Sequence, residues 1–166
     1  GGDVVMTRAD HATGTDRLAE VAEGLDAELI VNVQGDEPLI APAMIQAAVA
    51  PLLADHSIPM GTLRTPLTSL DEFRNPNVVK VVTDKDGLAL YFSRAPIPWD
   101  RDLLNDGTKA LPVGIMPLRH IGIYAYRGAF LNRLVREPPC ELERCESLEQ
   151  LRALYLGGRM AVVRTD

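Results

Sequence analysis

An acidic pentapeptide directly follows an apolar run in this sequence, and that placement suits a metal-binding carboxylate. Residues 29–33 have the pattern of a buried strand, and Gln34-Gly35-Asp36-Glu37-Pro38 comes next. Ligands of open α/β sheets bind just beyond the carboxyl ends of strands, where Gly35 lets the backbone turn tightly. Asp36 can offer oxygen ligands to Mg²⁺, which binds few protein carboxylates and completes its shell with water and phosphate. The alternative is a loop in which Asp36 or Glu37 caps the next helix.

A second polar segment, TRADHATGTDR at residues 7–17, lies between an expected strand and an expected helix. It combines hydroxyl groups, small residues and two arginines. Small residues let the backbone approach a planar base or a phosphate, and the N-terminus of the following helix attracts anions. One ligand can therefore meet several of these groups. The alternative is an ordinary helix cap followed by exposed arginines.

Strand alternation brings a histidine and a tyrosine to one face of the segment RHIGIY at residues 119–124. His120, Gly122 and Tyr124 are two residues apart, so their side chains point the same way. His120 and Tyr124 can hydrogen-bond a polyol or a carboxylate. A lone histidine is more often a packed or solvent-facing residue, and that alternative stays open at this point.

Two more segments carry side chains suited to a polar ligand. Arg94 and Arg101 flank a proline-rich stretch, and their planar guanidinium groups can bind a carboxylate through two hydrogen bonds. Trp99, between them, is equally suited to an interface or the core. Glu149 and Gln150 occupy adjacent positions of an expected helix, from which both can reach hydroxyl groups. Most such residues belong to a solvated helix face.

Composition favours one acidic domain. The 166 residues carry a formal net charge of -6, which argues against nonspecific nucleic-acid binding through a basic patch. We interpret residues 1–166 as a single domain. The two cysteines, Cys140 and Cys145, form neither a metal motif nor a disulfide framework, so we expect free thiols in a reducing compartment. The sequence shows no membrane-spanning pattern, and we expect a cytoplasmic protein.

Strand and helix patterns alternate in the first half, which favours a mainly parallel sheet with helices on both faces. We expect a helix that ends near Gly24, a helix that starts at Pro42, a short helix at 70–73, and one long helix at 141–156. The expected strands are 4–7, 29–33, 59–65, 78–83, 88–93, 121–126 and 160–164. Strands 78–83 and 88–93 should form a hairpin through Asp86-Gly87. Residues 94–117 should form an irregular excursion.

Six segments together resemble the CMP-Kdo synthetases, which activate the sugar acid 3-deoxy-manno-octulosonate (Kdo) as its CMP derivative. They occur in the family's order over nearly the whole chain. The segments are TRADHATGTDR (7–17), VNVQGDEP (31–38), NPNVVKVV (75–82), ALYFSRAPIPWDRD (89–102), RHIGIYAYR (119–127) and SLEQLRAL (147–154).

The resemblance implies a three-layer α/β/α nucleotide-diphospho-sugar-transferase-like fold, Rossmann-like, with a mixed sheet. A small antiparallel excursion would contribute to a homodimer contact. By family analogy, Asp36 binds Mg²⁺ and Gln34 lies between the nucleotide and the sugar acid. The residues expected beside CTP are Arg8, Thr13 and Thr15. The residues expected around the sugar acid are Arg94, His120, Tyr124, Glu149 and Gln150, with Arg94 as the carboxylate partner. The product would serve lipopolysaccharide biosynthesis.

Two family segments have no counterpart in this sequence. One is the amino-terminal strand with a basic loop that grips the triphosphate, and the other is a carboxy-terminal segment with a second metal-binding aspartate. We therefore expect the chain to be the middle of a larger domain and catalytically incomplete. The alternatives are a cytidylyltransferase for another sugar acid, such as sialic acid, and a noncatalytic nucleotide-sugar-binding domain.

Overall fold

The computed structural model describes residues 3–11, 13–33, 40–101, 110–111 and 114–165. Its strands are β1 (Leu29–Val33), β2 (Met60–Pro66), β3 (Lys80–Thr83), β4 (Ala89–Ser93), β5 (Leu118–Arg127) and β6 (Met160–Arg164). Its helices are α1 (Gly14–Glu23), α2 (Pro42–Ala54), α3 (Leu70–Arg74), α5 (Gly128–Arg136), α6 (Glu141–Glu146) and α7 (Gln150–Tyr155). In this part of the chain, no helix is long and apolar enough to cross a membrane.

The strands form one mixed sheet with the order β4-β3-β5-β2-β6, and β1 also pairs with β5. Strand β5 is antiparallel to β1, β2 and β3, and β3 and β4 form the expected antiparallel hairpin. Among the strand pairs of the described residues, only β2 and β6 run parallel. The expectation of a mainly parallel sheet is therefore wrong. Strand β5, which comes late in the sequence, lies between β1 and β2 and runs antiparallel to both.

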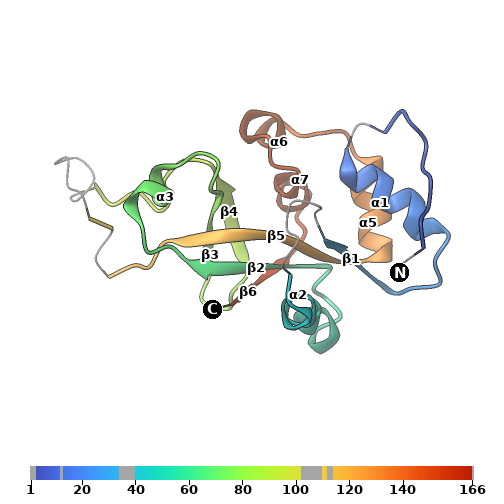
Figure 1. The fold of residues 1–166 in the computed structure, drawn as a ribbon, viewed down its shortest axis with the longest axis horizontal. Helices are drawn as coiled ribbons and strands as arrows, with labels where there is room; N and C mark the ends of the chain where they lie inside the picture. Colours follow the sequence, from blue (N-terminus) through green and yellow to red (C-terminus); the bar gives the residue numbers. More distant parts are fainter. Residues whose placement is uncertain (1–2, 12, 34–39, 102–109, 112–113, 166) are drawn as a thin grey trace.

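The sheet is covered on both faces, which confirms the three-layer α/β/α fold. Helix α2 lies on one side of the sheet, whereas α1, α5, α6 and α7 lie on the other (Figure 1). The alternating side chains of β5 serve both layers: Ile123 and Ala125 pack in the core on the α2 side, and Tyr126 packs in the opposite core. Odd and even positions of one strand thus face different helices.

Helix α2 packs closely on β2 because a glycine stands at the contact. A Cβ atom added to Gly61 would lie 2.9 Å from Cδ1 of Leu52 and would collide with the carbonyl oxygen of Ala48. Both contacts belong to α2, and both residues are fully buried. The small residue therefore sets the distance between this helix and the sheet.

Two expected elements differ in the structure. Residues 4–7 form no strand, and Val4 and Met6 are each 88% exposed. No described strand pairs with them, and an extended segment is not stable without such a neighbour. The expected long helix at 141–156 is instead two short helices separated at Ser147, whose φ of 52° is left-handed. Apolar residues spaced by three drift about 60° per step around a helix, so one straight helix cannot keep them on one face.

Candidate active site

One pocket of about 420 Å³ gathers most of the residues singled out in the sequence. Its lining includes residues of helices α1, α5 and α7, residues of strands β2 and β5, and the residue that follows strand β4. The predicted site residues that line it are Thr15, Arg94, His120, Tyr124, Glu149 and Gln150. These residues are separated by up to 135 positions in sequence, so their convergence comes from the fold.

His120 lines the pocket and is 8% exposed. Its Nε2 lies 2.9 Å from the hydroxyl of Thr62, and that hydroxyl also donates to the carbonyl of Ile123 at 2.7 Å. Since a hydroxyl has one proton, His120 Nε2 is the donor in the first contact and Nδ1 remains an acceptor. Burial, and secondly the positive charge of Arg119, lower the pKa of His120 to about 3. His120 is therefore neutral near pH 7.

Two aromatic rings pack against the histidine. The ring of Phe92 meets that of His120 edge-on, with centroids 4.9 Å apart and an angle of 80°. The centroid of Tyr124 lies 5.3 Å from that of His120. Burial, and secondly the charge of Glu149, raise the pKa of the Tyr124 phenol. Tyr124 thus keeps its proton and can act as a hydrogen-bond donor.

Arg94 provides positive charge at the pocket, at the point where strand β4 ends. Its guanidinium donates from Nε to the carbonyl of Glu146 at 2.6 Å and from Nη1 to the carbonyl of Pro76 at 2.9 Å. A longer contact of 3.3 Å joins Nη2 to the carbonyl of Ser147. These contacts fix the direction of the side chain. They use three of its five N–H groups within the described part of the chain.

The break between α6 and α7 places a carboxylate and an amide at the pocket. Glu149 is the residue before α7 and accepts a hydrogen bond from the hydroxyl of Thr15 in α1. Gln150 is the first residue of α7 and is 6% exposed. The expectation that both lie within one long helix is wrong, but both reach the pocket. The hydrogen bond from Thr15 to Glu149 joins a residue expected beside the nucleotide to a residue expected beside the sugar acid.

Two residues expected beside a nucleotide lie away from this pocket. Thr13 caps α1: its hydroxyl accepts from the backbone of Asp16, whose carboxylate in turn accepts from the backbone of Thr13. Arg8 is bound to Glu20 through its backbone N–H and its Nε, and its side chain is 70% exposed. Thr13 is therefore a helix cap, in agreement with the alternative interpretation, whereas Thr15 lines the pocket.

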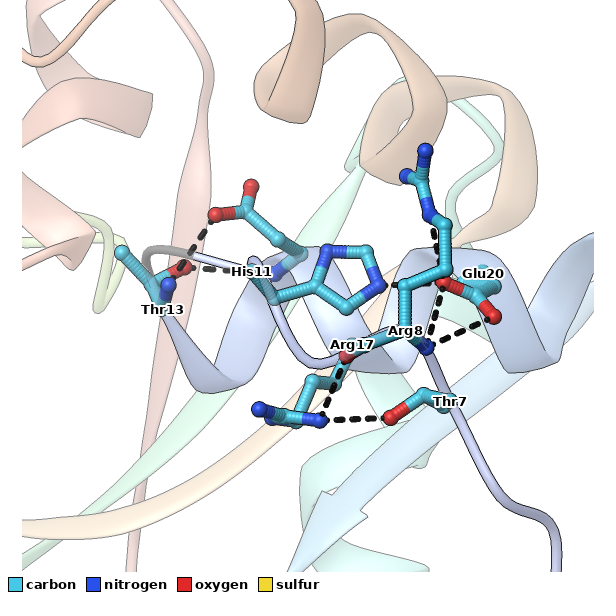
Figure 2. A network of polar contacts seen from close by, with 7 residues as sticks. Thr7, Arg8, His11, Thr13, Arg17 and Glu20 are labelled. Atoms are coloured by element: carbon cyan, nitrogen blue, oxygen red, sulfur yellow. Dashed lines mark hydrogen bonds and ion pairs between the residues drawn. The ribbon is translucent and has the colours of Figure 1, made fainter.

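Helix α1 holds the preceding residues through the side chains of Arg17 and Glu20 (Figure 2). Figure 2 shows His11 and Arg8 converging on Glu20, while Arg17 reaches back along the chain. The side chain of Arg17 donates to the hydroxyl of Thr7 at 2.6 Å and to the carbonyl of Arg8 at 3.0 Å. The hydrogen bond from His11 is the main cause that lowers the pKa of Glu20. These contacts fix Thr7, Arg8 and His11 against α1.

The expected metal and catalytic residues, Asp36 and Gln34, lie outside the described residues. Within the described part, no group of three or more histidine, cysteine, aspartate or glutamate side chains could hold a metal ion. The magnesium prediction remains a prediction.

Five residues with polar side-chain groups line the same pocket but were not predicted as site residues: Asn77, Arg119, Tyr126, Ser147 and Arg152. All five belong to segments that carried the family resemblance, but no chemical role was assigned to them. Arg152 is 5% exposed and forms a paired contact with Glu143 at 2.6 and 2.7 Å. This ion pair joins α7 to α6. The pattern that predicted one continuous helix gave no reason to look for such a link.

A sequence model of the family described as cytidylyltransferase matches residues 1–160. The chain belongs to the cytidylyltransferase family. A relative from Syntrophotalea carbinolica, named 3-deoxy-manno-octulosonate cytidylyltransferase, is 62% identical over the whole of this chain and 66% of its own length. A relative of the same name from Geobacter metallireducens is 58% identical, again over all of this chain and 66% of the relative.

Solved structures give the same family assignment. A structure of CMP:2-keto-3-deoxy-manno-octonic acid synthetase complexed with CTP superposes with a TM-score of 0.88 and 38% identity. The match covers 99% of this cytidylyltransferase chain and 64% of the other. These relatives confirm the resemblance drawn from the six sequence segments. The chain spans about two thirds of the length of the relatives it matches.

Proposed function

We propose that the protein containing this chain transfers CMP from CTP to 3-deoxy-manno-octulosonate and releases pyrophosphate. The observation that carries the proposal is the convergence of Arg94, His120, Tyr124, Glu149 and Gln150 on one pocket, in a chain whose close relatives bear that enzyme name. The relative solved with CTP supports the choice of nucleotide.

The pocket chemistry suits a polyhydroxylated acid. Arg94 brings a positive charge, and its contacts with the described residues use three of its five N–H groups, which leaves two in that part of the chain for a carboxylate. Tyr124 donates a hydrogen bond, Glu149 accepts, and Gln150 does both, which matches the hydroxyl groups of a sugar. A neutral His120 adds a hydrogen-bonding group without adding positive charge.

The proposed reaction is attack by the anomeric hydroxyl oxygen of the sugar acid on the α-phosphorus of CTP. A bond forms between that oxygen and phosphorus, the O–H bond of the hydroxyl breaks and its proton passes to solvent water, and the bond from phosphorus to the bridging oxygen breaks, so pyrophosphate leaves. His120 has a pKa of about 3 and is a poor base near neutral pH, so its part is to orient the substrate. The other pocket residues likewise bind and position. We propose Asp36 as a ligand of Mg²⁺, which when bound would neutralise charge on the phosphate oxygens.

The test of this function is pyrophosphate release by the whole protein with Mg²⁺. CTP is compared with the other nucleoside triphosphates, and 3-deoxy-manno-octulosonate with sialic acid. We expect release only with CTP and the eight-carbon acid. Release only with sialic acid would overturn the sugar assignment, and no release with any pair would favour a noncatalytic binding domain.

The metal proposal has its own test in the whole protein. Asp36→Asn should depress turnover far more than it lowers the melting temperature, because amide oxygen is a weaker Mg²⁺ ligand than carboxylate. Glu37→Gln is the matched control, since it makes the same chemical change at the next residue. Near-normal turnover of Asp36→Asn would contradict the assignment.

We also propose a cytoplasmic homodimer whose product enters lipopolysaccharide biosynthesis. Free cysteines Cys140 and Cys145 support a reducing compartment.

Two exposed apolar side chains suit a contact between subunits. Leu90 on β4 is 61% exposed, and Trp99, in the excursion after β4, is 57% exposed. This exposure contradicts a core role for Trp99. Sedimentation analysis tests the dimer: a monomer at micromolar concentration would argue against it.

A further inference from the structure

Glu146, the last residue of α6, contacts Arg94 through both its side chain and its backbone. Its carboxylate accepts from the hydroxyl of Ser93 at 2.6 Å and from the backbone N–H of Arg94 at 2.9 Å. Its own carbonyl accepts from Nε of Arg94 at 2.6 Å. The end of β4 is thereby joined to the break between the two helices, and Glu146 is not among the described residues that line the pocket.

A buried lysine holds Arg94 from the other side. Lys80 is fully buried, and its Nζ donates to the carbonyls of Arg94 at 2.5 Å, Val78 at 2.5 Å and Asn75 at 2.9 Å. All three of its N–H groups are thus used. Since Arg94 also donates to the carbonyl of Pro76, the turn before β3 and the end of β4 are locked together.

The charges in this cluster explain why one carboxylate matters. Lys80 and Arg94 are two cations held close together, and each lies near Glu146. Burial lowers the pKa of Lys80, Arg94 lowers it further, and Glu146 opposes that shift. Without the carboxylate, the two cations repel each other and the backbone N–H of Arg94 loses its acceptor.

We propose that Glu146 is a positioning residue that, together with Lys80, aims the guanidinium of Arg94 at the carboxylate of the sugar acid. The inference rests on the proposed function, which it deepens by naming what fixes the carboxylate-binding arginine. Glu146 acts through Arg94 and does not touch the substrate. Glu146 directly precedes the segment SLEQLRAL. The break between α6 and α7 at Ser147 lets the backbone carbonyls of Glu146 and Ser147 accept hydrogen bonds from Arg94.

The kinetic test uses Glu146→Gln in the whole protein, with Glu141→Gln as the matched control on an exposed position of the same helix. We expect the KM for 3-deoxy-manno-octulosonate to rise about tenfold, the size of one charge-assisted hydrogen bond, with the KM for CTP changed by less than about twofold. The turnover at saturating sugar acid should be largely kept. Equal rises in both KM values, or no rise for the sugar acid, would overturn the proposal.

A second variant guards against loss of folding. Ser93→Ala removes one of the two groups bound to the Glu146 carboxylate and leaves the bond from the Arg94 backbone intact. We expect the same selective rise in the KM for the sugar acid, smaller than in Glu146→Gln. A uniform loss of activity with a lower melting temperature and unchanged KM values would show a merely structural contact.

A spectroscopic readout separates this proposal from the proposed function. The NMR signal of the Arg94 Nε–H, assigned by its loss in Arg94→Lys, should exchange slowly with water in the unliganded protein because it is bonded to the carbonyl of Glu146. Glu146→Gln keeps this backbone carbonyl but changes the carboxylate that binds Ser93 and the backbone of Arg94. If that carboxylate holds the carbonyl against Arg94, exchange should become faster in Glu146→Gln and stay unchanged in Glu141→Gln. Unchanged exchange in Glu146→Gln would overturn the positioning role, even if the substrate differs from the one proposed.

Discussion

Lowering the pH should destabilise the protein through His120. In the folded chain the pKa of His120 is about 3, against an ordinary value of 6.5. The unfolded chain therefore takes up a proton as the pH falls through 6.5, while the folded chain stays neutral until about pH 3. Stability should fall across this window, because protonation favours the unfolded state.

The expected size follows from the two pKa values. Between pH 8 and pH 5 the unfolded histidine becomes almost fully protonated and the folded one does not, which costs about 2 kcal/mol of unfolding free energy. The structural cause is burial at the base of the pocket, where Nε2 already donates to Thr62 and Arg119 opposes a further positive charge.

Urea unfolding at pH 8 and pH 5 measures this effect, with His120→Gln as the comparison. Both proteins share all other titrating groups, so the difference between their pH dependences isolates His120. The wild type should lose about 2 kcal/mol more than the variant between the two pH values. Equal losses would refute the assignment of a buried, neutral histidine.

Three other perturbations test the fold around the site. Glu143→Gln should lower the free energy of unfolding by about 3–5 kcal/mol, because it leaves the buried charge of Arg152 without its partner; a loss under about 1 kcal/mol in urea unfolding would contradict a buried pair. Gly61→Ala should lower the melting temperature and expression of folded protein, since the new methyl group meets a backbone carbonyl of α2. Thr15→Val removes the hydrogen bond to Glu149 and should weaken substrate binding with little change in melting temperature, and unchanged substrate KM values would argue against a role for this contact.

Local patterns predicted the elements whose signals lie within a few neighbouring residues. Strand 29–33, the helix after Pro42 and the hairpin around Asp86-Gly87 all form as expected. The same alternation predicted that His120 and Tyr124 share a face. These features depend on side-chain periodicity and turn residues, which a sequence displays directly.

Features that depend on distant partners could not be predicted in this way. The position of β5 between β1 and β2 is a property of the assembled sheet, and no residue of β5 by itself indicates it. The left-handed Ser147 divides an apparently continuous helical pattern. Glu146 and Lys80 escaped attention because their partners include backbone carbonyl and amide groups, which every residue carries and which leave no motif.

Family resemblance, rather than periodicity, named most of the pocket. By its chemistry alone, Arg94 suited a carboxylate, whereas most residues placed like Glu149 and Gln150 belong to a solvated helix face. The structure brings these three to the pocket that holds His120 and Tyr124. It also places Arg8 and Thr13 in contacts outside that pocket. The resemblance of segment 7–17 did not separate these two residues from Thr15, which lines the pocket.

The most direct test of the account is the effect of Arg94→Ala on the two substrates of the whole protein. The affinities for 3-deoxy-manno-octulosonate and for CTP are measured separately, with Arg144→Ala as a control that removes an exposed arginine from α6. We expect a loss of affinity for the sugar acid that clearly exceeds the loss for CTP, because Arg94 supplies a positive charge for the carboxylate. Equal losses for both ligands would contradict it and would make Arg94 a structural arginine.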